Sequence, residues 1–173
     1  MYAVITQLIG FIGTGLMIGS FQCKKSRNLF LFQMSSNAMY AVHFIMLGAF
    51  TGSVIIFISL FRNLVLYKHR SKWAQWRGWM PLFIAVYLIT TVLTWEDYFS
   101  ALPCLAMVTL TLFSWSRNGR KIRLANFFVA QPSWIIYEIH TFSISGVISD
   151  AFSMGSIAVS FVRYGWKALD GEG

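Results

Sequence analysis

The basic residues of this chain are confined to alternate connections between its hydrophobic segments. Seven apolar segments can be drawn, at roughly 2–20, 28–47, 50–67, 79–95, 98–115, 122–141 and 144–163. All fourteen Lys and Arg residues fall in the first, third and fifth connections, in the segment ends beside them or at the C-terminal end, and the other connections have none. Membrane proteins collect Lys and Arg on their cytoplasmic side in this way. The pattern predicts a chain that crosses a membrane seven times, with its N-terminus outside and its C-terminus in the cytoplasm.

The composition agrees with this prediction. Hydrophobic residues make up 57% of the chain and charged residues 12%, whereas a soluble domain has about 25% charged residues. Seven spans of about 20 residues use nearly the whole chain. We therefore expect a single transmembrane domain over 1–173 in the lipid bilayer, with a short cytoplasmic tail at 166–173. The net charge of +8 does not indicate nucleic-acid binding, because the cations lie in short loops beside apolar runs.

The two halves of the chain share a pattern of polar residues. Tyr-x-x-His followed by Ser-x-x-Arg occurs twice, as Tyr40, His43, Ser59 and Arg62 and then as Tyr137, His140, Ser160 and Arg163. We expect a first repeat of three helices at about 2–67 and a second at about 98–165, joined by a linker helix at about 79–95. Three helices and a linker leave both triplets in the same orientation, which is typical of transporters. The predicted fold class is an all-α membrane protein of 3+1+3 helices.

Polar side chains are concentrated in the second and sixth spans. They are Gln33, Ser35, Ser36, Asn37 and Tyr40, and then Asn126, Gln131, Ser133, Trp134, Tyr137 and Glu138. Such groups are costly against hydrocarbon, so they should point into the bundle or a wet cavity. The repeat places Asn37 opposite Trp134, where an amide and an indole could hold a small polar ring.

This arrangement predicts a set of substrate-binding residues. They are Asn37, Tyr40, Trp134, Tyr137, Glu138, Gln33, Ser59 and Ser160. The alternative for these side chains is hydrogen bonding between helices, worth about 0.6 kcal/mol per pair.

Glu138 and Asp150 are the only acidic residues within or beside the spans. The predicted topology places both in the outer half of the membrane, near His43 and His140. A carboxylate inside a membrane is a functional candidate, and a cluster of His and carboxylate groups could bind a proton during transport. The alternative is a solvated outer mouth, because both acids lie within a turn or two of the interface.

The sequence carries no recognisable catalytic or metal-binding pattern. It lacks a Gly-rich phosphate loop and the HExxH, Gly-x-Ser-x-Gly and CxxC motifs. Cys23 is expected at the cytoplasmic end of the first span and Cys104 in the outer half of the fifth, so we expect no disulfide. We predict that the protein is not an enzyme and needs neither metal nor cofactor.

Two further features concern packing and partners. Gly15 and Gly19 form a GxxxG spacing, which allows two helices to approach closely. This spacing predicts tight packing inside the bundle, with a homo-oligomer as the second alternative. The segment 68–79 mixes tryptophans with Lys and Arg, which is typical of a segment at the cytoplasmic interface.

The chain resembles the YgjV-type family of bacterial inner-membrane proteins over roughly 5–165. The resemblance is carried by Tyr40-Ala-Val-His43-Phe-Ile-Met-Leu-Gly48-Ala-Phe-Thr-Gly52 with Arg62, and by the run from Leu102-Pro103 through Trp134-Ile-Ile-Tyr to Ser145-Gly146 and Arg163-Tyr164. The triplet repeat is similar to that of the SWEET and PQ-loop transporters and, more distantly, the PnuC vitamin transporters. The resemblance implies an inner-membrane location and alternating access to a central pocket.

The chain also departs from those transporters. The Pro-Gln dipeptide of the PQ-loop group is absent, since Gln131-Pro132 has the reverse order. SWEET pockets use Asn on the third helix of each triplet, where the nearest candidates here are Ser59 and Ser160. A small-solute transporter or facilitator is predicted, with a sugar or a nucleoside-like vitamin as the expected class. The alternative is a membrane protein that transports nothing and recruits a partner through its basic cytoplasmic face.

Overall fold

Each apolar segment of the sequence forms a helix in the computed structural model, which describes residues 2–165. The helices are α1 (Tyr2–Phe21), α2 (Ser26–Leu47), α3 (Phe50–Tyr67), η1 (Lys72–Gln75), α4 (Trp79–Leu93), η2 (Tyr98–Ser100), α5 (Ala101–Trp115), α6 (Gly119–Ala125), η3 (Asn126–Ala130), α7 (Gln131–His140) and α8 (Ile144–Tyr164). The predicted tail at 166–173 lies outside the described residues.

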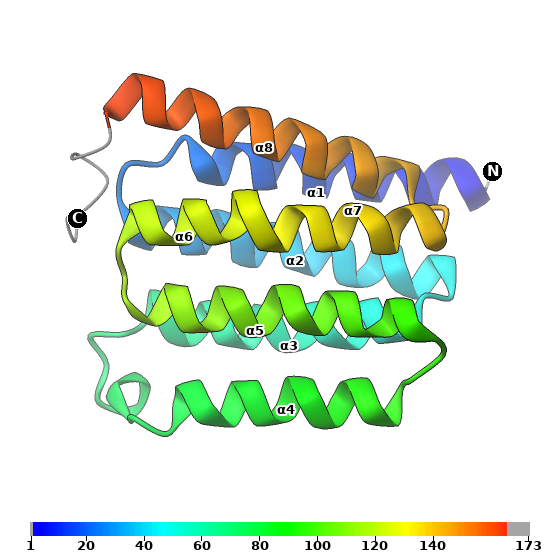
Figure 1. The fold of residues 1–173 in the computed structure, drawn as a ribbon. Coiled ribbons are helices and arrows are strands. Elements are labelled where there is room, and N and C mark those ends of the chain that lie inside the picture. Colours follow the sequence, from blue (N-terminus) through cyan, green and yellow to red (C-terminus); the bar gives the residue numbers. More distant parts are fainter. Residues whose placement is uncertain (1, 166–173) are drawn as a thin grey trace.

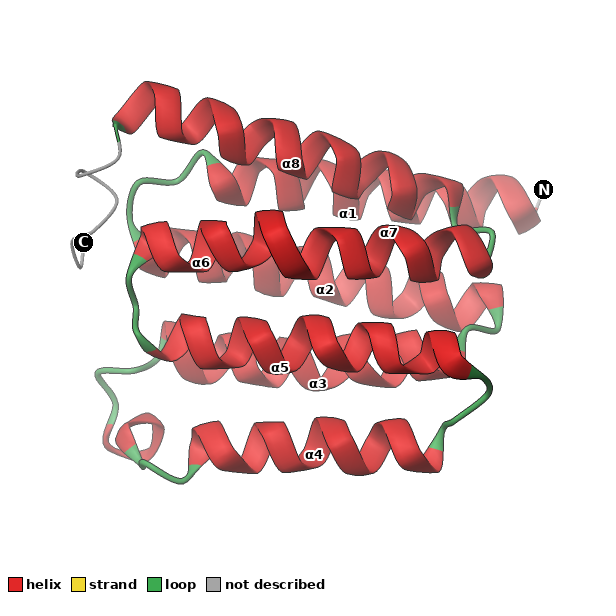
Figure 2. Cartoon of the chain, viewed as in Figure 1, coloured by secondary structure: helices red, strands yellow, loops and turns green. Residues whose placement is uncertain are grey.

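Elements α6, η3 and α7 follow one another without a break, so residues 2–165 form seven helical rods (Figure 1). No strand occurs in this part of the chain (Figure 2). The predicted all-α class is therefore confirmed. The rods run alternately in opposite directions, as expected for a chain that passes back and forth through one layer.

Short, capped turns join α2 to α3, α4 to α5 and α7 to α8, all at the same end of the bundle. Gly48 ends α2 in the left-handed conformation at φ 75°, which glycine adopts at low cost. Asp97 caps η2 by accepting a hydrogen bond from the Phe99 backbone N–H at 2.9 Å. Ser143 caps α8 by accepting a hydrogen bond from the Gly146 backbone N–H at 3.3 Å. These caps satisfy backbone groups that a helix end leaves unpaired.

The rods pack as a closed ring with one helix at its edge (Figure 1). Helix α1 contacts α2 and α8, α2 contacts α3, and α3 contacts α5. Helix α5 contacts α7, and α7 contacts α8, which completes the ring. Helix α4 lies outside this ring against α3 and α5. The ring encloses the space in which the polar side chains of α2, α7 and α8 meet.

Four helices are long and apolar enough to cross a membrane by length and composition: Val4–Phe21, Phe50–Tyr67, Tyr98–Trp115 and Ile144–Tyr164. Helix α4 is apolar but shorter. Helix α2 and the α6–η3–α7 rod carry the polar residues noted above, and most of these are buried inside the bundle. A chain with several such helices is a multi-pass membrane protein.

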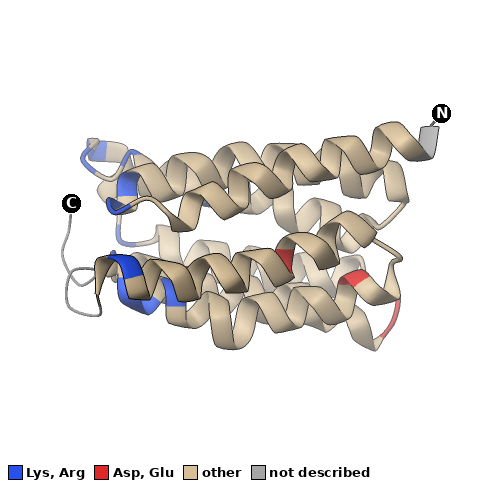
Figure 3. Cartoon of the chain, turned by 90° about the horizontal axis from the view of Figure 1, so that it is seen from above, with Lys and Arg blue, Asp and Glu red and all other residues tan. Residues whose placement is uncertain are grey.

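Charge is sorted along the long axis of the bundle (Figure 3). Lys and Arg residues of the described range gather at one end, on the α1–α2, α3–α4 and α5–α6 connections and the adjoining helical turns. Glu96 and Asp97 lie in the α4–α5 connection at the opposite end. The bundle therefore has one basic end and one end with no basic residue.

The close packing of α1 lies at different glycines from those of the GxxxG spacing. A Cβ added at Gly10 would overlap the side chain of Ser145 on α8, and one added at Gly13 would come within 3.1 Å of a ring on α2. By contrast, a Cβ at Gly15 would meet no atom within 4 Å. The prediction of tight packing inside the bundle at Gly15 was wrong, because this glycine lies on the outer face of α1.

Candidate functional site

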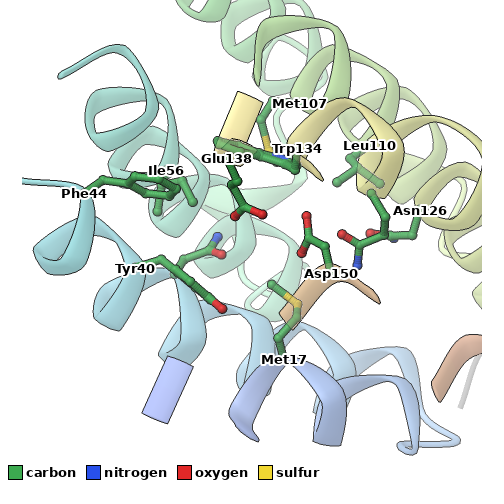
Figure 4. A pocket seen from close by; sticks show the side chains of 12 residues that line it. Met17, Tyr40, Phe44, Ile56, Met107, Leu110, Asn126, Trp134, Glu138 and Asp150 are labelled. Atoms are coloured by element: carbon green, nitrogen blue, oxygen red, sulfur yellow. The ribbon is translucent and has the colours of Figure 1, made fainter. Parts of the chain in front are cut away.

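A cavity of about 40 Å³ lies in the middle of the ring of helices (Figure 4). Its lining comes from every rod except α4: Met17, Asn37, Tyr40, Phe44, Ile56, Met107, Leu110, Asn126, Gln131, Trp134, Glu138 and Asp150. Because a buried water needs roughly 10–15 Å³ of such space, the cavity has room for a small ion or a few waters. It is the place where residues from both halves of the sequence meet.

Helix α2 contributes one face to this cavity. Asn37, Tyr40 and Phe44 are three and four residues apart, so they lie along one side of the helix. The Tyr40 hydroxyl and the Thr14 hydroxyl of α1 share a hydrogen bond at 2.9 Å. The Phe44 ring stacks on the Trp134 indole with ring centres 5.9 Å apart. The sequence expectation that Asn37 and Trp134 line the same space agrees with this arrangement.

A change of helical pitch directs the residues of the α6–η3–α7 rod into the cavity. The Gln131 backbone N–H bonds the carbonyl of Asn126, five residues back, as in a π-helix. Pro132 follows directly and has no N–H to donate. The wider turn keeps Asn126 and Gln131 on the same side as Trp134, where all three line the cavity. Single π turns of this kind are frequent at functional sites.

Two carboxyl groups face one another in the cavity (Figure 4). Glu138 of α7 is 4% exposed and Asp150 of α8 is 8% exposed. The alternative of a solvated outer mouth was therefore wrong, because the packing of α7 against α8 covers both side chains. When the Gln131 amide presents its nitrogen to Asp150, that nitrogen lies 2.9 and 3.1 Å from the two carboxylate oxygens.

Glu138 has a different environment from Asp150. Its Oε2 atom is buried and has no hydrogen-bond partner among the described residues. Gly146 of α8 lies against the same carboxyl group, and a Cβ at this position would overlap it. The close approach of α8 at a glycine is thus what allows the Glu138 carboxyl to turn inward.

The two histidines that were predicted near these acids have their partners outside the cavity. The Nδ1 atom of His43 lies 2.9 Å from the Thr6 carbonyl oxygen and its Nε2 atom 3.1 Å from the Ser143 hydroxyl. A carbonyl only accepts, so Nδ1 carries the proton and Nε2 accepts from the serine. His140 pairs with Asp97 at 2.6 Å near the surface. Neither imidazole lines the cavity with Glu138 and Asp150.

The structure brings together some of the predicted substrate-binding residues. Asn37, Tyr40, Trp134 and Glu138 all line the cavity. Gln33 is buried one turn before Asn37 on α2 and lies outside the lining. The four lining residues come from α2 and α7, the two rods whose polarity the sequence analysis singled out.

The remaining predicted residues have structural partners instead. The Tyr137 hydroxyl accepts a hydrogen bond from the Gly52 backbone N–H at 3.0 Å and so joins α7 to α3. Ser59 shares a hydrogen bond with the Tyr87 hydroxyl at 2.9 Å. Ser160 accepts from Arg123 at 3.1 Å. None of these three lines the cavity.

The prediction of the site omitted Asn126, Gln131 and Asp150. Asn126 and Gln131 were visible as polar residues in an apolar span, but α-helical spacing does not place them together, and only the π turn does. Asp150 was visible as one of two acids within the spans. Its position beside Glu138 depends on how α7 and α8 pack, which the sequence pattern does not give.

Glu138 and Met107 connect the cavity lining to neighbouring parts of the bundle. Glu138 also lines a groove of about 250 Å³ between the end of α7 and the start of α8. On the other side, Met107 of α5 lines the cavity, and its sulfur accepts hydrogen bonds from Ser59 at 3.0 Å and Arg62 at 3.7 Å. Glu138 therefore lies between the cavity and the outer groove, and Met107 between the cavity and the buried Arg62.

Comparison with known proteins gives one family. The family model Imp-YgjV, described as bacterial inner membrane protein, matches residues 4–167. Neither the curated proteins nor the solved structures contain a match to the chain.

Proposed function

The chain belongs to the Imp-YgjV family of bacterial inner membrane proteins, and from that premise we propose that it is a small-solute transporter or facilitator. The central cavity of about 40 Å³ is the closed form of its solute site. The cavity widens when it opens, alternately, toward the two sides of the membrane. The observation that carries this proposal is the cavity itself. It contains two acids, three amides and two aromatic side chains with polar atoms, all in the middle of an apolar bundle.

The contact pattern of the helices supports a repeat of 3+1+3 helices. If α1, α2 and α3 correspond to α5, the α6–η3–α7 rod and α8, each contact between neighbours in the ring has a counterpart. The α1–α2 contact corresponds to α5–α7, α2–α3 to α7–α8, and α1–α8 to α5–α3. Helix α4 then serves as the linker. Rocking of one triplet against the other is the usual way in which such repeats expose a site at their interface.

The side chains at the two ends of the cavity support alternating access. Glu138 lines both the cavity and the groove at the end of α7, and Met107 lies between the cavity and the buried Arg62. Methionine is a flexible side chain that adapts to different packing arrangements. A tilt of α7 would open the cavity on the Glu138 side, and a tilt of α5 would open it on the Met107 side.

The charge distribution supports an orientation in the inner membrane. Under the positive-inside rule the basic end faces the cytoplasm, which places the N-terminus of α1 outside and the end of α8 in the cytoplasm (Figure 3). The groove beside Glu138 then faces the periplasm.

A binding screen followed by uptake tests the proposed function. Purified protein is heated with a panel of small polar metabolites, including sugars, nucleosides and amines, because a bound ligand raises the melting temperature. Each hit is then measured for uptake into proteoliposomes. We expect Asn37→Ala to abolish this uptake while the variant still inserts and folds, and Ser35→Ala, on the outer face of α2, to leave it unchanged. Uptake by Asn37→Ala at the wild-type rate would contradict the proposal.

A second candidate, recruitment of a cytoplasmic partner, is favoured by one observation. Trp73 and Trp76, in and beside η1, are 48% and 57% exposed at the basic end. Neutralising Lys68, Arg70, Lys72 and Arg77 together tests it. Loss of a co-purifying protein with unchanged transport would support recruitment, whereas unchanged co-purification would exclude this surface.

A further inference from the structure

We propose that Glu138 and Asp150 bind one small monovalent metal cation in the central cavity. Helices α7 and α8 present these two carboxyl groups to the same space from different directions (Figure 4). The inference deepens the proposed function by giving the cavity a coupling ion. The experiments below measure cation binding and not transport. A failure of this inference can therefore be distinguished from a failure of the proposed function.

The first argument is the unpartnered oxygen of Glu138. Oε2 is buried and has no hydrogen-bond partner among the described residues. An ionised carboxylate would leave this oxygen without a donor. A cation contacting Oε2 does satisfy it, because it compensates the charge and replaces the missing hydrogen bond.

The second argument is the balance of charge. No Lys or Arg belongs to the cavity lining. The two guanidinium groups buried within the described bundle are bonded elsewhere, Arg62 to Asn63 and Thr111 and Arg123 to the end of α1. Two buried carboxylates that face each other repel, and a cation between them offsets this repulsion, as a shared proton would.

The third argument gives the charge of the ion. Asp150 already receives the Gln131 amide at both of its oxygens, and hydrogen bonds of this kind stabilise a carboxylate. Of the two carboxyl groups, only that of Glu138 is left with an oxygen that has no partner among the described residues. Residues 2–165 contain no group of three or more His, Cys, Asp or Glu side chains suited to a metal ion. A monovalent alkali cation, held by oxygen ligands, fits this set better than a divalent or transition metal.

The fourth argument is the size and lining of the cavity. At about 40 Å³ it accommodates a bare ion or an ion with a few waters, since one water takes roughly 10–15 Å³. Neutral oxygens complete the lining. Asn126 donates its side-chain nitrogen to the Ile122 carbonyl at 2.8 Å, which leaves its oxygen available to the cavity. The amide of Asn37 and the hydroxyl of Tyr40 lie on the opposite wall.

Glu138 is also the residue that connects the site to the groove at the end of α7, because its side chain lines both the groove and the cavity.

Thermal unfolding of the purified protein, followed by tryptophan fluorescence, tests the proposal. LiCl, NaCl and KCl are titrated separately against choline chloride at constant ionic strength and pH. We expect one alkali cation to raise the melting temperature in a saturable way, by about 5–10 °C at a hundredfold excess over its Kd. Equilibrium dialysis with the radioactive form of that cation, or with ⁸⁶Rb⁺ in place of K⁺, should give one site per chain.

Two variants decide whether the cavity is the site. Glu138→Gln keeps the shape of the side chain and should abolish both the temperature shift and the bound ion, and Asp150→Asn should weaken both at least tenfold. Asp97→Asn, at the surface pair with His140, is the matched control and should bind as wild type. The proposal is overturned if no alkali cation stabilises the protein, if only Mg²⁺, Ca²⁺ or a change of pH does so, or if folded Glu138→Gln still binds.

Discussion

Gly146 of α8 lies directly against the carboxyl group of Glu138 on α7, so closely that a Cβ at position 146 would overlap Oε1. This contact fixes where the acid points. The carboxyl group turns into the cavity because the neighbouring helix has no side chain there. A glycine on one helix thus determines the environment of an acid on another.

The first prediction concerns this contact. Gly146→Ala should displace the Glu138 carboxyl and lower the free energy of unfolding by about 1–3 kcal/mol through overpacking, and it should remove the cation-dependent shift in melting temperature. Gly155→Ala is the matched control on the same helix, where an added Cβ would meet no atom within 4 Å. We expect it to be neutral or to stabilise by up to about 1 kcal/mol. Equal effects of the two substitutions would contradict the assigned contact.

The second prediction concerns Arg123, which joins α6 to the C-terminal end of α1. Its Nη2 atom donates to the carbonyl oxygens of Phe21 at 3.1 Å and Cys23 at 2.8 Å. Arg123→Ala leaves these carbonyls unpaired, so unfolding should become easier by on the order of 3 kcal/mol. Lys121→Ala, an exposed substitution on the same helix, should change stability by less than about 0.5 kcal/mol. The free energies of unfolding of both variants are compared by denaturation in the same detergent. If Arg123→Ala is as stable as the wild type, Arg123 does not stabilise the C-terminal end of α1.

The third prediction concerns orientation. Single cysteines replace Tyr98 at the end without basic residues and Arg70 at the basic end, in a background with Cys23→Ser and Cys104→Ser. Because the basic end should face the cytoplasm, a membrane-impermeant maleimide should label Tyr98→Cys in intact cells and Arg70→Cys only after permeabilisation. The reverse pattern would invert the orientation. Labelling of both positions from outside would show that α4, which lies between them in the chain, does not cross the membrane.

The helices themselves were largely predictable from the sequence, because apolar runs bounded by polar connections leave little choice inside a membrane. Helix α3 occupies the expected range 50–67. Helix α4 ends at Leu93 and not at 95, since the chain turns there toward Glu96 and Asp97. The largest local difference is the π turn at Asn126–Ala130. Pro132 follows directly after this turn, but the sequence did not show that the turn would widen.

The site was only partly predictable. Polarity within an apolar span marked Asn37, Tyr40, Trp134 and Glu138, which line the cavity. Ser59 and Ser160 were chosen by analogy of position in the repeat, and they bond other side chains. What the sequence did not supply is the packing between helices, because the pattern gives the polar face of each helix but not its neighbour.

The central claim is that the cavity opens alternately to the two sides of the membrane. Accessibility of Asn37→Cys, in the background without Cys23 and Cys104, tests this claim without knowledge of the solute. A small, impermeant, positively charged thiosulfonate is added to right-side-out vesicles and, separately, to inside-out vesicles. The account predicts modification from both sides, each slower than at an exposed loop cysteine because the side chain is buried between openings. A cysteine at position 37 that reacts from neither side, or from one side only, while the loop cysteines react normally, would contradict it.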